Sequence, residues 1–201
     1  MRRLAAATAL AALLAAGCKT GSAVTSSPAP STNEGAWAAA RDRFTRTHKL
    51  YDVLDDVAFA TATYQAPEVR AARVDRLADW KGSLPAEREA AQAKERAEGA
   101  AAEEFLLAFF TADRSANDLS KPTSTWRVSL LVNGTEQALP TKIELVRADP
   151  TLRMLYPYVT DFDTLYRIRF PRFPGEAPLA SLPFQLRIAS ALGRVELSWK
   201  P

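Results

Sequence analysis

The segment WRVSLLVNG, residues 126–134, decides how the second half of the chain is interpreted. Its apolar residues alternate with Arg127 and Ser129, and this period of two is typical of a strand with one buried face. The segment ends in Asn133-Gly134, a pair that favours a tight β-hairpin turn. We therefore expect a strand here that is followed at once by an antiparallel partner.

The same alternation recurs through the rest of the C-terminal region. Apolar residues at every second position are Ile143 and Leu145, Tyr166, Ile168 and Phe170, Phe184, Leu186 and Ile188, and Val195, Leu197 and Trp199. The run Phe105–Phe110 is short and continuously apolar, and we interpret it as a buried strand. Short, evenly spaced strands punctuated by prolines predict an antiparallel β-sandwich of immunoglobulin-like size over residues 103–201.

Residues 34–102 carry a different pattern, rich in alanine and charge. Apolar residues recur there every seven positions and predict an amphipathic helix. This stripe consists of Trp37, Phe44, Tyr51 and Ala58. Pro67 ends or restarts the helix, Gly82 fits a helix C-terminus, and Pro85 opens a further helix that runs toward Ala102.

The helical and strand-rich regions carry opposite net charges. Residues 34–120 hold 12 basic and 16 acidic side chains, a net charge of −4, whereas residues 121–201 hold 11 and 7, a net charge of +4. Opposite charges favour docking of the two regions on each other. The predicted fold class is therefore α+β, with N-terminal alanine-rich helices packed against a C-terminal antiparallel β-sandwich.

The first residues have the layout of an export signal. Arg2 and Arg3 precede the apolar run Leu4–Ala16. These thirteen residues would rise about 20 Å as a helix, short of the roughly 30 Å of bilayer hydrocarbon, and so predict a signal peptide over residues 1–17. Without Arg2 and Arg3 the chain has 24 basic and 23 acidic side chains, and this balance argues against a nucleic-acid partner.

The sequence LAAGC, residues 14–18, resembles the lipobox of bacterial lipoproteins. In that family diacylglycerol is attached to the cysteine, and a peptidase that needs small preceding residues cuts just before it. Ala15 departs from the pattern, because the family usually has leucine there. The resemblance implies that Cys18, the only cysteine, carries acyl chains such as palmitate and anchors the protein in the cell envelope. Lys19 stands where an aspartate would signal retention in the inner membrane, so the outer membrane is the expected destination.

The alternative for Cys18 is an ordinary residue beside a soluble-secretion cleavage site of the A-x-A type. Residues 18–33 are rich in serine, threonine, alanine and proline, and they predict a flexible tether after the lipidated cysteine. The expected organisation is thus a signal peptide at 1–17, this tether, a helical region at 34–102 and a sandwich-like region at 103–201.

Residues that form common catalytic and metal sites are scarce. The chain has one histidine, His48, and one cysteine, so ordinary zinc, copper and haem sites lack ligands. His48 lies in a polar, basic stretch, and we interpret it as a surface residue of the first helix. The sequence has no nucleophile elbow, phosphate-binding loop or dinucleotide-binding glycine motif. We therefore expect no catalytic residue, no metal and no cofactor, and a protein that is not an enzyme.

The segment 153–173 combines aromatic rings with arginines, which are residue types that stack on sugars or anchor a protein partner. From it we select a candidate partner-binding surface. This surface consists of Tyr156, Tyr158, Arg167, Arg169 and Arg172. The alternative is that the rings belong to the core and that the arginines are merely solvated.

The expected function is that of a non-enzymatic, lipid-anchored envelope protein that binds another envelope component, protein or glycan, through its β region. A first alternative is a carboxylate-dependent glycan hydrolase that uses Asp52, Asp55 and Asp56, which would share one helical turn. A second alternative is a structural subunit of a secretion or motility apparatus, joined by strand addition at an uncovered sheet edge.

Overall fold

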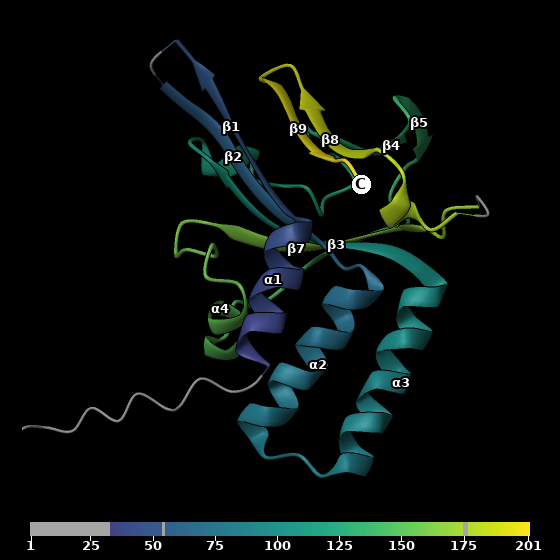
Figure 1. Cartoon of the computed structure of the whole chain (residues 1–201). Helices are drawn as coiled ribbons and strands as arrows, with labels where there is room; N and C mark the ends of the chain where they lie inside the picture. The colour runs from purple at the N-terminus through teal and green to yellow at the C-terminus, as the bar shows by residue number, and fades with distance from the viewer. Residues whose placement is uncertain (1–32, 54, 175–176) are drawn as a thin grey trace, which may run out of the picture.

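The structure, a computed structural model, describes residues 33–53, 55–174 and 177–201. It is a mixed α+β fold, as the sequence predicts, with helices and two antiparallel sheets (Figure 1). The elements up to the middle of the chain are α1 (Glu34–Phe44), β1 (Thr45–Asp52), β2 (Asp55–Tyr64), α2 (Pro67–Lys81), α3 (Pro85–Ala101) and β3 (Ala102–Thr111). The elements that follow are β4 (Arg127–Val132), β5 (Thr135–Ala138), β6 (Lys142–Leu145), α4 (Pro150–Leu155), β7 (Thr164–Pro171), β8 (Phe184–Ser190) and β9 (Gly193–Trp199).

Sheet A has the strand order β1-β2-β3-β7-β6, and sheet B has the order β5-β4-β8-β9. The two sheets face each other across one apolar core. Phe105 of β3 lies 6.2 Å from Phe184 of β8 and 5.5 Å from Trp199 of β9, measured between ring centroids. All three rings are buried. Because aromatic side chains bury the largest apolar areas, these contacts between the sheets make β3 the centre of the fold.

The strands predicted in the C-terminal region are confirmed. The run Phe105–Phe110 lies within β3, and the other alternating segments lie in β4, β6, β7, β8 and β9. Asn133 and Gly134 join β4 to β5 with φ angles of 51° and 81°. A two-residue hairpin turn of this kind requires positive φ at both central residues, which asparagine and glycine tolerate best.

The prediction of one long first helix is wrong beyond Phe44. Residues 45–52 and 55–64 are the two strands of the β1–β2 hairpin, so Tyr51 lies on a strand and the seven-residue spacing is coincidental. β-Branched threonines in this segment favour extended backbone and pair across the hairpin. The Oγ1 atoms of Thr45 and Thr63, for example, are 2.7 Å apart.

The division into a helical region and a strand-rich region also fails as a structural boundary. Strands β1 and β2 belong to the same sheet as β3, β7 and β6, and residues 102 and 103 both lie in β3. The later helices agree better with the prediction. α2 starts at Pro67 and is followed by Gly82 at a φ of 61°, and α3 starts at Pro85.

The face of sheet A that points away from sheet B is covered over much of its area by α1, by α4 and by the residues that follow α4. The indole Nε1–H of Trp37 donates to the Leu155 carbonyl at 3.2 Å, and the hydroxyls of Tyr158 and Thr63 are 2.9 Å apart. Leu106, in the centre of this face, is only 6% exposed. Helices and sheets therefore form three layers, with sheet A in the middle (Figure 1).

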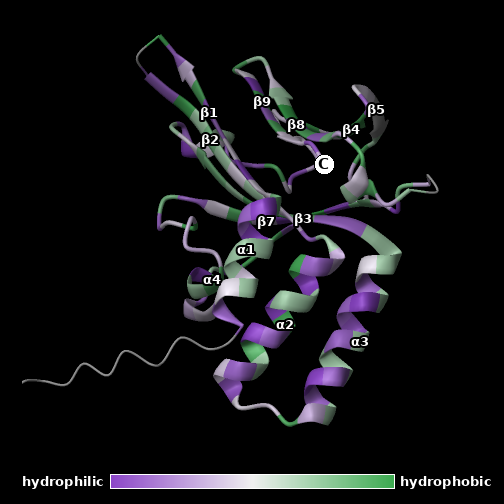
Figure 2. Ribbon diagram, in the orientation of Figure 1, coloured by the Kyte–Doolittle hydropathy of each residue, from purple (hydrophilic) through white to green (hydrophobic). Residues whose placement is uncertain are grey.

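Helix α3 is attached to α2 through polar contacts. Arg88 pairs with Asp79 at 2.7 Å, and Gln92 donates to Asp75 at 2.9 Å. Nearer the start of α2, Arg73 pairs with Glu95 at 2.7 Å. No residue of α3 is buried, and its ribbon is largely hydrophilic (Figure 2). Since apolar burial contributes little there, the stability of this helix pair depends on its charges.

The long edge strands of the two sheets lie beside each other. Arg46 of β1 donates to the Ser198 carbonyl of β9 at 3.0 Å, and His48 Nδ1 lies 3.1 Å from the Glu196 carbonyl. The other two edges, β5 and β6, have four residues each. A long uncovered edge, the feature that would favour strand addition by a structural subunit, is absent from the described part of the chain.

Candidate functional site

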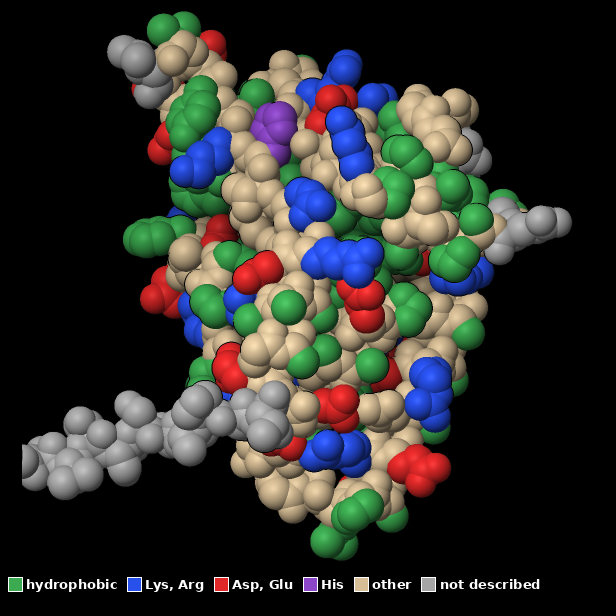
Figure 3. All heavy atoms as spheres, in the orientation of Figure 1, with side chains coloured by type: hydrophobic (Ala, Val, Ile, Leu, Met, Phe, Trp, Pro, Cys, Tyr) green, Lys and Arg blue, Asp and Glu red, His purple; other side chains and the backbone are tan. Residues whose placement is uncertain are grey.

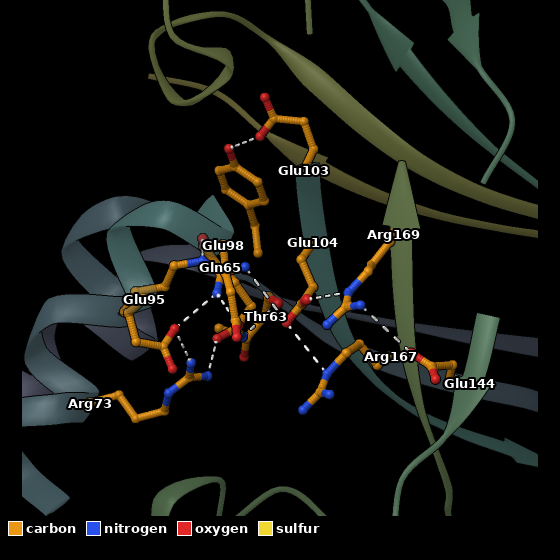
Figure 4. Close-up of polar contacts among 12 residues, drawn as sticks. Thr63, Gln65, Arg73, Glu95, Glu98, Glu103, Glu104, Glu144, Arg167 and Arg169 are labelled. Atoms are coloured by element: carbon orange, nitrogen blue, oxygen red, sulfur yellow. Dashed lines mark hydrogen bonds and ion pairs between the residues drawn. The ribbon is translucent and has the colours of Figure 1, made fainter. Parts of the chain in front are cut away.

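The densest group of buried charges surrounds Glu104 on β3 (Figure 4). Its carboxylate lies 2.9 Å from Nε of Arg169, 3.5 Å from Nε of Arg167 and 3.6 Å from Nη2 of Arg70. The first two arginines extend from the neighbouring strand β7, and Arg70 extends from α2. The Glu104 side chain is 8% exposed and the Arg70 side chain 3% exposed. A buried carboxylate therefore joins helix α2 to the middle of sheet A.

Glu95 of α3 extends this group of charges across the helix pair. One of its oxygens accepts from Arg73 at 2.7 Å and from Arg70 at 2.9 Å. Burial opposes ionisation of Glu95, but the two guanidinium groups outweigh it and lower the pKa of this carboxyl group. Arg73 also donates to the side-chain oxygen of Gln65, which in turn accepts from the Tyr156 hydroxyl.

A second buried carboxylate, Glu103, points to the opposite face of sheet A. It accepts from the Tyr64 hydroxyl at 2.6 Å and forms a 2.6 Å ion pair with Arg172. Burial, followed by the negative charge of Glu103, raises the pKa of the Tyr64 hydroxyl above its ordinary range. Tyr64 is therefore a neutral hydrogen-bond donor at physiological pH.

The cluster around Glu104 and Glu95 is balanced in charge. It consists of Arg70, Arg73, Arg167 and Arg169 against Glu95, Glu98, Glu104 and Glu144. Every one of these residues has at least one opposite charge within 4.0 Å. Such a cluster positions the helices on the sheet, and it leaves no unpaired acid or base among its members.

The residues of the expected partner-binding surface lie in different environments. Tyr156 is 2% exposed and packs edge-on against Trp37, so its inclusion in a surface is wrong. Tyr158 is partly buried, and its hydroxyl bonds Thr63. The alternative, that the rings belong to the core, is confirmed for Tyr156. The ring is buried because α4 and the residues after it pack on sheet A. Local periodicity in the sequence does not reveal this packing.

The three arginines of that surface are half-exposed, but they do not form one group. Arg167 and Arg169 pair with Glu104, whereas Arg172 pairs with Glu103 on the other side of the sheet. The sequence interpretation of solvated arginines missed these buried glutamates. The adjacent pair Glu103-Glu104 before an apolar run was the available signal, since acids inside a strand usually require cationic partners.

The remaining candidate residues lie on the β1–β2 hairpin. Asp52, Asp55 and Asp56 are exposed near its tip, and Asp52 pairs in register with Asp55. They share no helical turn, so that expectation is wrong, and none of the three lines a described cavity. His48 is likewise on a strand, and its ring reaches β9.

The outer end of sheet A carries an aromatic row that the covering helices leave open. Tyr51 and Phe59 have ring centroids 5.5 Å apart, and Phe59 stacks on Phe110 at 5.4 Å. Lys49 Nζ lies 5.4 Å from the Phe59 centroid. We call these four residues the distal surface. Hydrophobic side chains are visible at the upper left of Figure 3, where the hairpin projects.

Each helix in the described part of the chain is too short or too polar to span a lipid bilayer. Within the same ranges, no three histidine, cysteine, aspartate or glutamate side chains are grouped as metal ligands. Cys18, the expected lipidation site, lies outside the described residues, as do the predicted signal peptide and nearly all of the tether.

In comparisons with protein-family models, with curated proteins and with solved structures, the chain matches none of them.

Proposed function

We propose that this chain is a non-enzymatic envelope protein, anchored by acyl chains on Cys18 in the outer membrane, that binds another envelope protein through the distal surface. The anchoring part of the proposal depends on the sequence at residues 1–18. In finer detail, the proposed fold is a β-sandwich of immunoglobulin-like size against which alanine-rich helices pack, with the β1–β2 hairpin counted as part of the sandwich.

The observation that carries the binding role is the aromatic row at the outer end of sheet A, where Tyr51 and the partly buried Phe59 lie on the projecting hairpin and the partly buried Phe110 lies on β3. Tyr51 is 51% exposed, and Val53 at the tip of the hairpin is 92% exposed. Aromatic side chains are enriched among the residues that supply most of the binding energy at protein interfaces. Apolar side chains gathered on one projecting edge cost solubility unless a partner covers them.

The charge of the hairpin tip favours a particular class of partner. Asp52, Asp55 and Asp56 place three negative charges beside Tyr51, and Lys49 is the neighbouring cation on the distal surface. An acidic rim attracts a basic surface and repels an anionic glycan. We therefore infer a protein partner that presents apolar side chains flanked by lysine or arginine.

The test is site-directed cross-linking in intact cells. A photoreactive amino acid at position 53 captures whatever lies against the hairpin, and mass spectrometry identifies it. We expect one protein to be captured, and capture to fall when Tyr51→Ala is added. Leu84→Ala is the matched control, because Leu84 is also an exposed apolar residue, 65% exposed, but lies in the α2–α3 loop.

Other results would contradict specific parts of the proposal. Capture of a glycan would overturn the inferred partner class, and equal capture with and without Tyr51→Ala would overturn the distal surface. The anchoring is tested separately by mass spectrometry of the protein from the same cells. An unmodified residue 18 in material free of lipid would overturn it.

A further inference from the structure

A groove of about 440 Å³ lies between the start of α2 and the end of α3. Its volume is within the range of pockets that hold small ligands. Pro67 and Ala71 form its wall on α2, and Gly99 and Ala100 form its wall on α3. Because these residues have small side chains or none, they leave an apolar space that no described side chain fills.

The polar groups that line the groove are mainly cationic. Arg70 is held at the groove by Glu95 and by the Gln65 carbonyl, at 2.9 and 3.0 Å, so its position is fixed. Arg172 uses one terminal nitrogen, Nη1, for its ion pair with Glu103. Arg96 is exposed, and its hydrogen bond to the side-chain oxygen of Gln92 is long, at 3.4 Å.

Among the described residues that line the groove, Glu95 is the acidic one, and it is already paired with Arg70 and Arg73. The groove also includes Pro67, the first residue of α2, and the residue before it, Ala66, offers no side-chain cap. Glu68 already lies in the first turn of α2, so the attraction for an anion is left to the arginines. Arg96 and Arg172 line the groove but do not belong to the balanced cluster around Glu104, and their guanidinium groups favour a negative group there.

We propose that the groove binds an amphiphile with an oxyanion head group, a carboxylate or a phosphate, and a short apolar tail. The head group lies between Arg96 and Arg172, whose guanidinium forks suit both oxyanions. The tail lies along Ala71, Gly99 and Ala100. This site is distinct from the distal surface and does not depend on the function proposed for it.

The test measures binding to the full chain carrying Cys18→Ser, which removes acylation. The probes are decanoate and decyl phosphate, which distinguish the two head groups, with acetate and decanol as controls that lack the tail or the charge. We expect at least one of the first two probes to bind with a dissociation constant on the order of 1 mM or tighter. In amide NMR spectra its shifts should concentrate at residues 71, 99 and 100.

Two substitutions test the two parts of the groove. Arg96→Gln should weaken binding about tenfold, because it removes a charged hydrogen bond from an exposed residue without disturbing the core. Ala100→Phe, also at an exposed position, should block the tail and abolish the shifts. Arg194→Gln, on β9, is the matched control and should leave binding unchanged.

Three results would overturn the proposal. They are no saturable binding of either charged probe, decanol binding as tightly as decanoate, and an equal effect of Arg96→Gln and Arg194→Gln. Circular dichroism of each variant shows whether it is folded, so that loss of structure is not mistaken for loss of the site.

Discussion

Replacing Glu104 by glutamine isolates the charge at the centre of the buried cluster. Glutamine keeps the size of the side chain and one acceptor oxygen, so the change removes the ion pairs and little else. Arg167 and Arg169 are 41% and 32% exposed and can be rehydrated, so each contributes less than about 1 kcal/mol. Arg70 is 3% exposed and cannot regain water, so most of the cost arises from its pairing with Glu104.

Removing one partner from a buried ion pair costs about 3–5 kcal/mol. Arg70 keeps Glu95 and the Gln65 carbonyl as acceptors, so we expect the lower part of that range or slightly less, about 2–3 kcal/mol. For a domain of this size that corresponds to a fall in Tm of about 5–10 °C. Thermal unfolding of the full chain carrying Cys18→Ser, followed by circular dichroism at neutral pH, measures it.

The matched control is Glu144→Gln. Glu144 is 35% exposed and pairs with the exposed Lys142 at 2.8 Å and with Arg169 at 3.9 Å. Because these are surface ion pairs, Glu144→Gln should lower Tm by no more than about 2 °C. If the Glu104→Gln protein has a Tm within about 1 °C of that of the parent chain, or if Glu144→Gln lowers Tm as much, the pairing of Arg70 with Glu104 does not stabilise the fold as described.

Three further predictions concern the helix pair and the hairpin turn. The pKa of Glu95 is lower in the folded state, so its contribution to stability is present above the unfolded pKa of about 4.3 and is lost as the pH falls below it. In hydrogen-exchange measurements, the amides of α3 should therefore lose protection in acid before those of β3 do. Glu95→Gln should show the same loss of protection already at neutral pH. Gly99→Ala should lower the urea midpoint of unfolding, although alanine has the better helix propensity, because the added Cβ would lie 3.2 Å from Cδ of Arg70, whose guanidinium group is held by ion pairs. A higher urea midpoint would show that the Arg70 side chain moves freely. Gly134→Ala should cost about 1–2 kcal/mol through backbone strain alone, since its φ is 81° and no atom lies within 4 Å of the added Cβ, and an unchanged urea midpoint would contradict this.

The strands of the C-terminal region could be predicted because each carries its own signal. Trp126 to Gly134 contain both the alternation of a half-buried strand and the turn residues that reverse the chain. These preferences act between neighbouring residues, so they do not depend on what the strand later contacts. The start of α2 at Pro67 and the αL residue Gly82 after its end are local in the same sense.

The β1–β2 hairpin was mispredicted because two periodicities coexist in it. Tyr51 and Ala58 fit a seven-residue spacing. However, Ala58, Ala60 and Ala62 also recur at every second position, as in a strand, and all three side chains are completely buried on one face of the sheet. Alanine is a strong helix former in isolation. At these positions, however, pairing with β3 satisfies the backbone hydrogen-bonding groups, and the small side chains fit beneath sheet B.

The sequence by itself determined the alternating strands, the hairpin at Asn133-Gly134 and the limits of α2 and α3, because these follow from forces between residues a few positions apart. Only the tertiary structure decided which rings are buried and which charges meet. Glu104, Arg70 and Arg169 are far apart in the chain, and desolvation compels their pairing only once α2 and sheet A exclude water from around them.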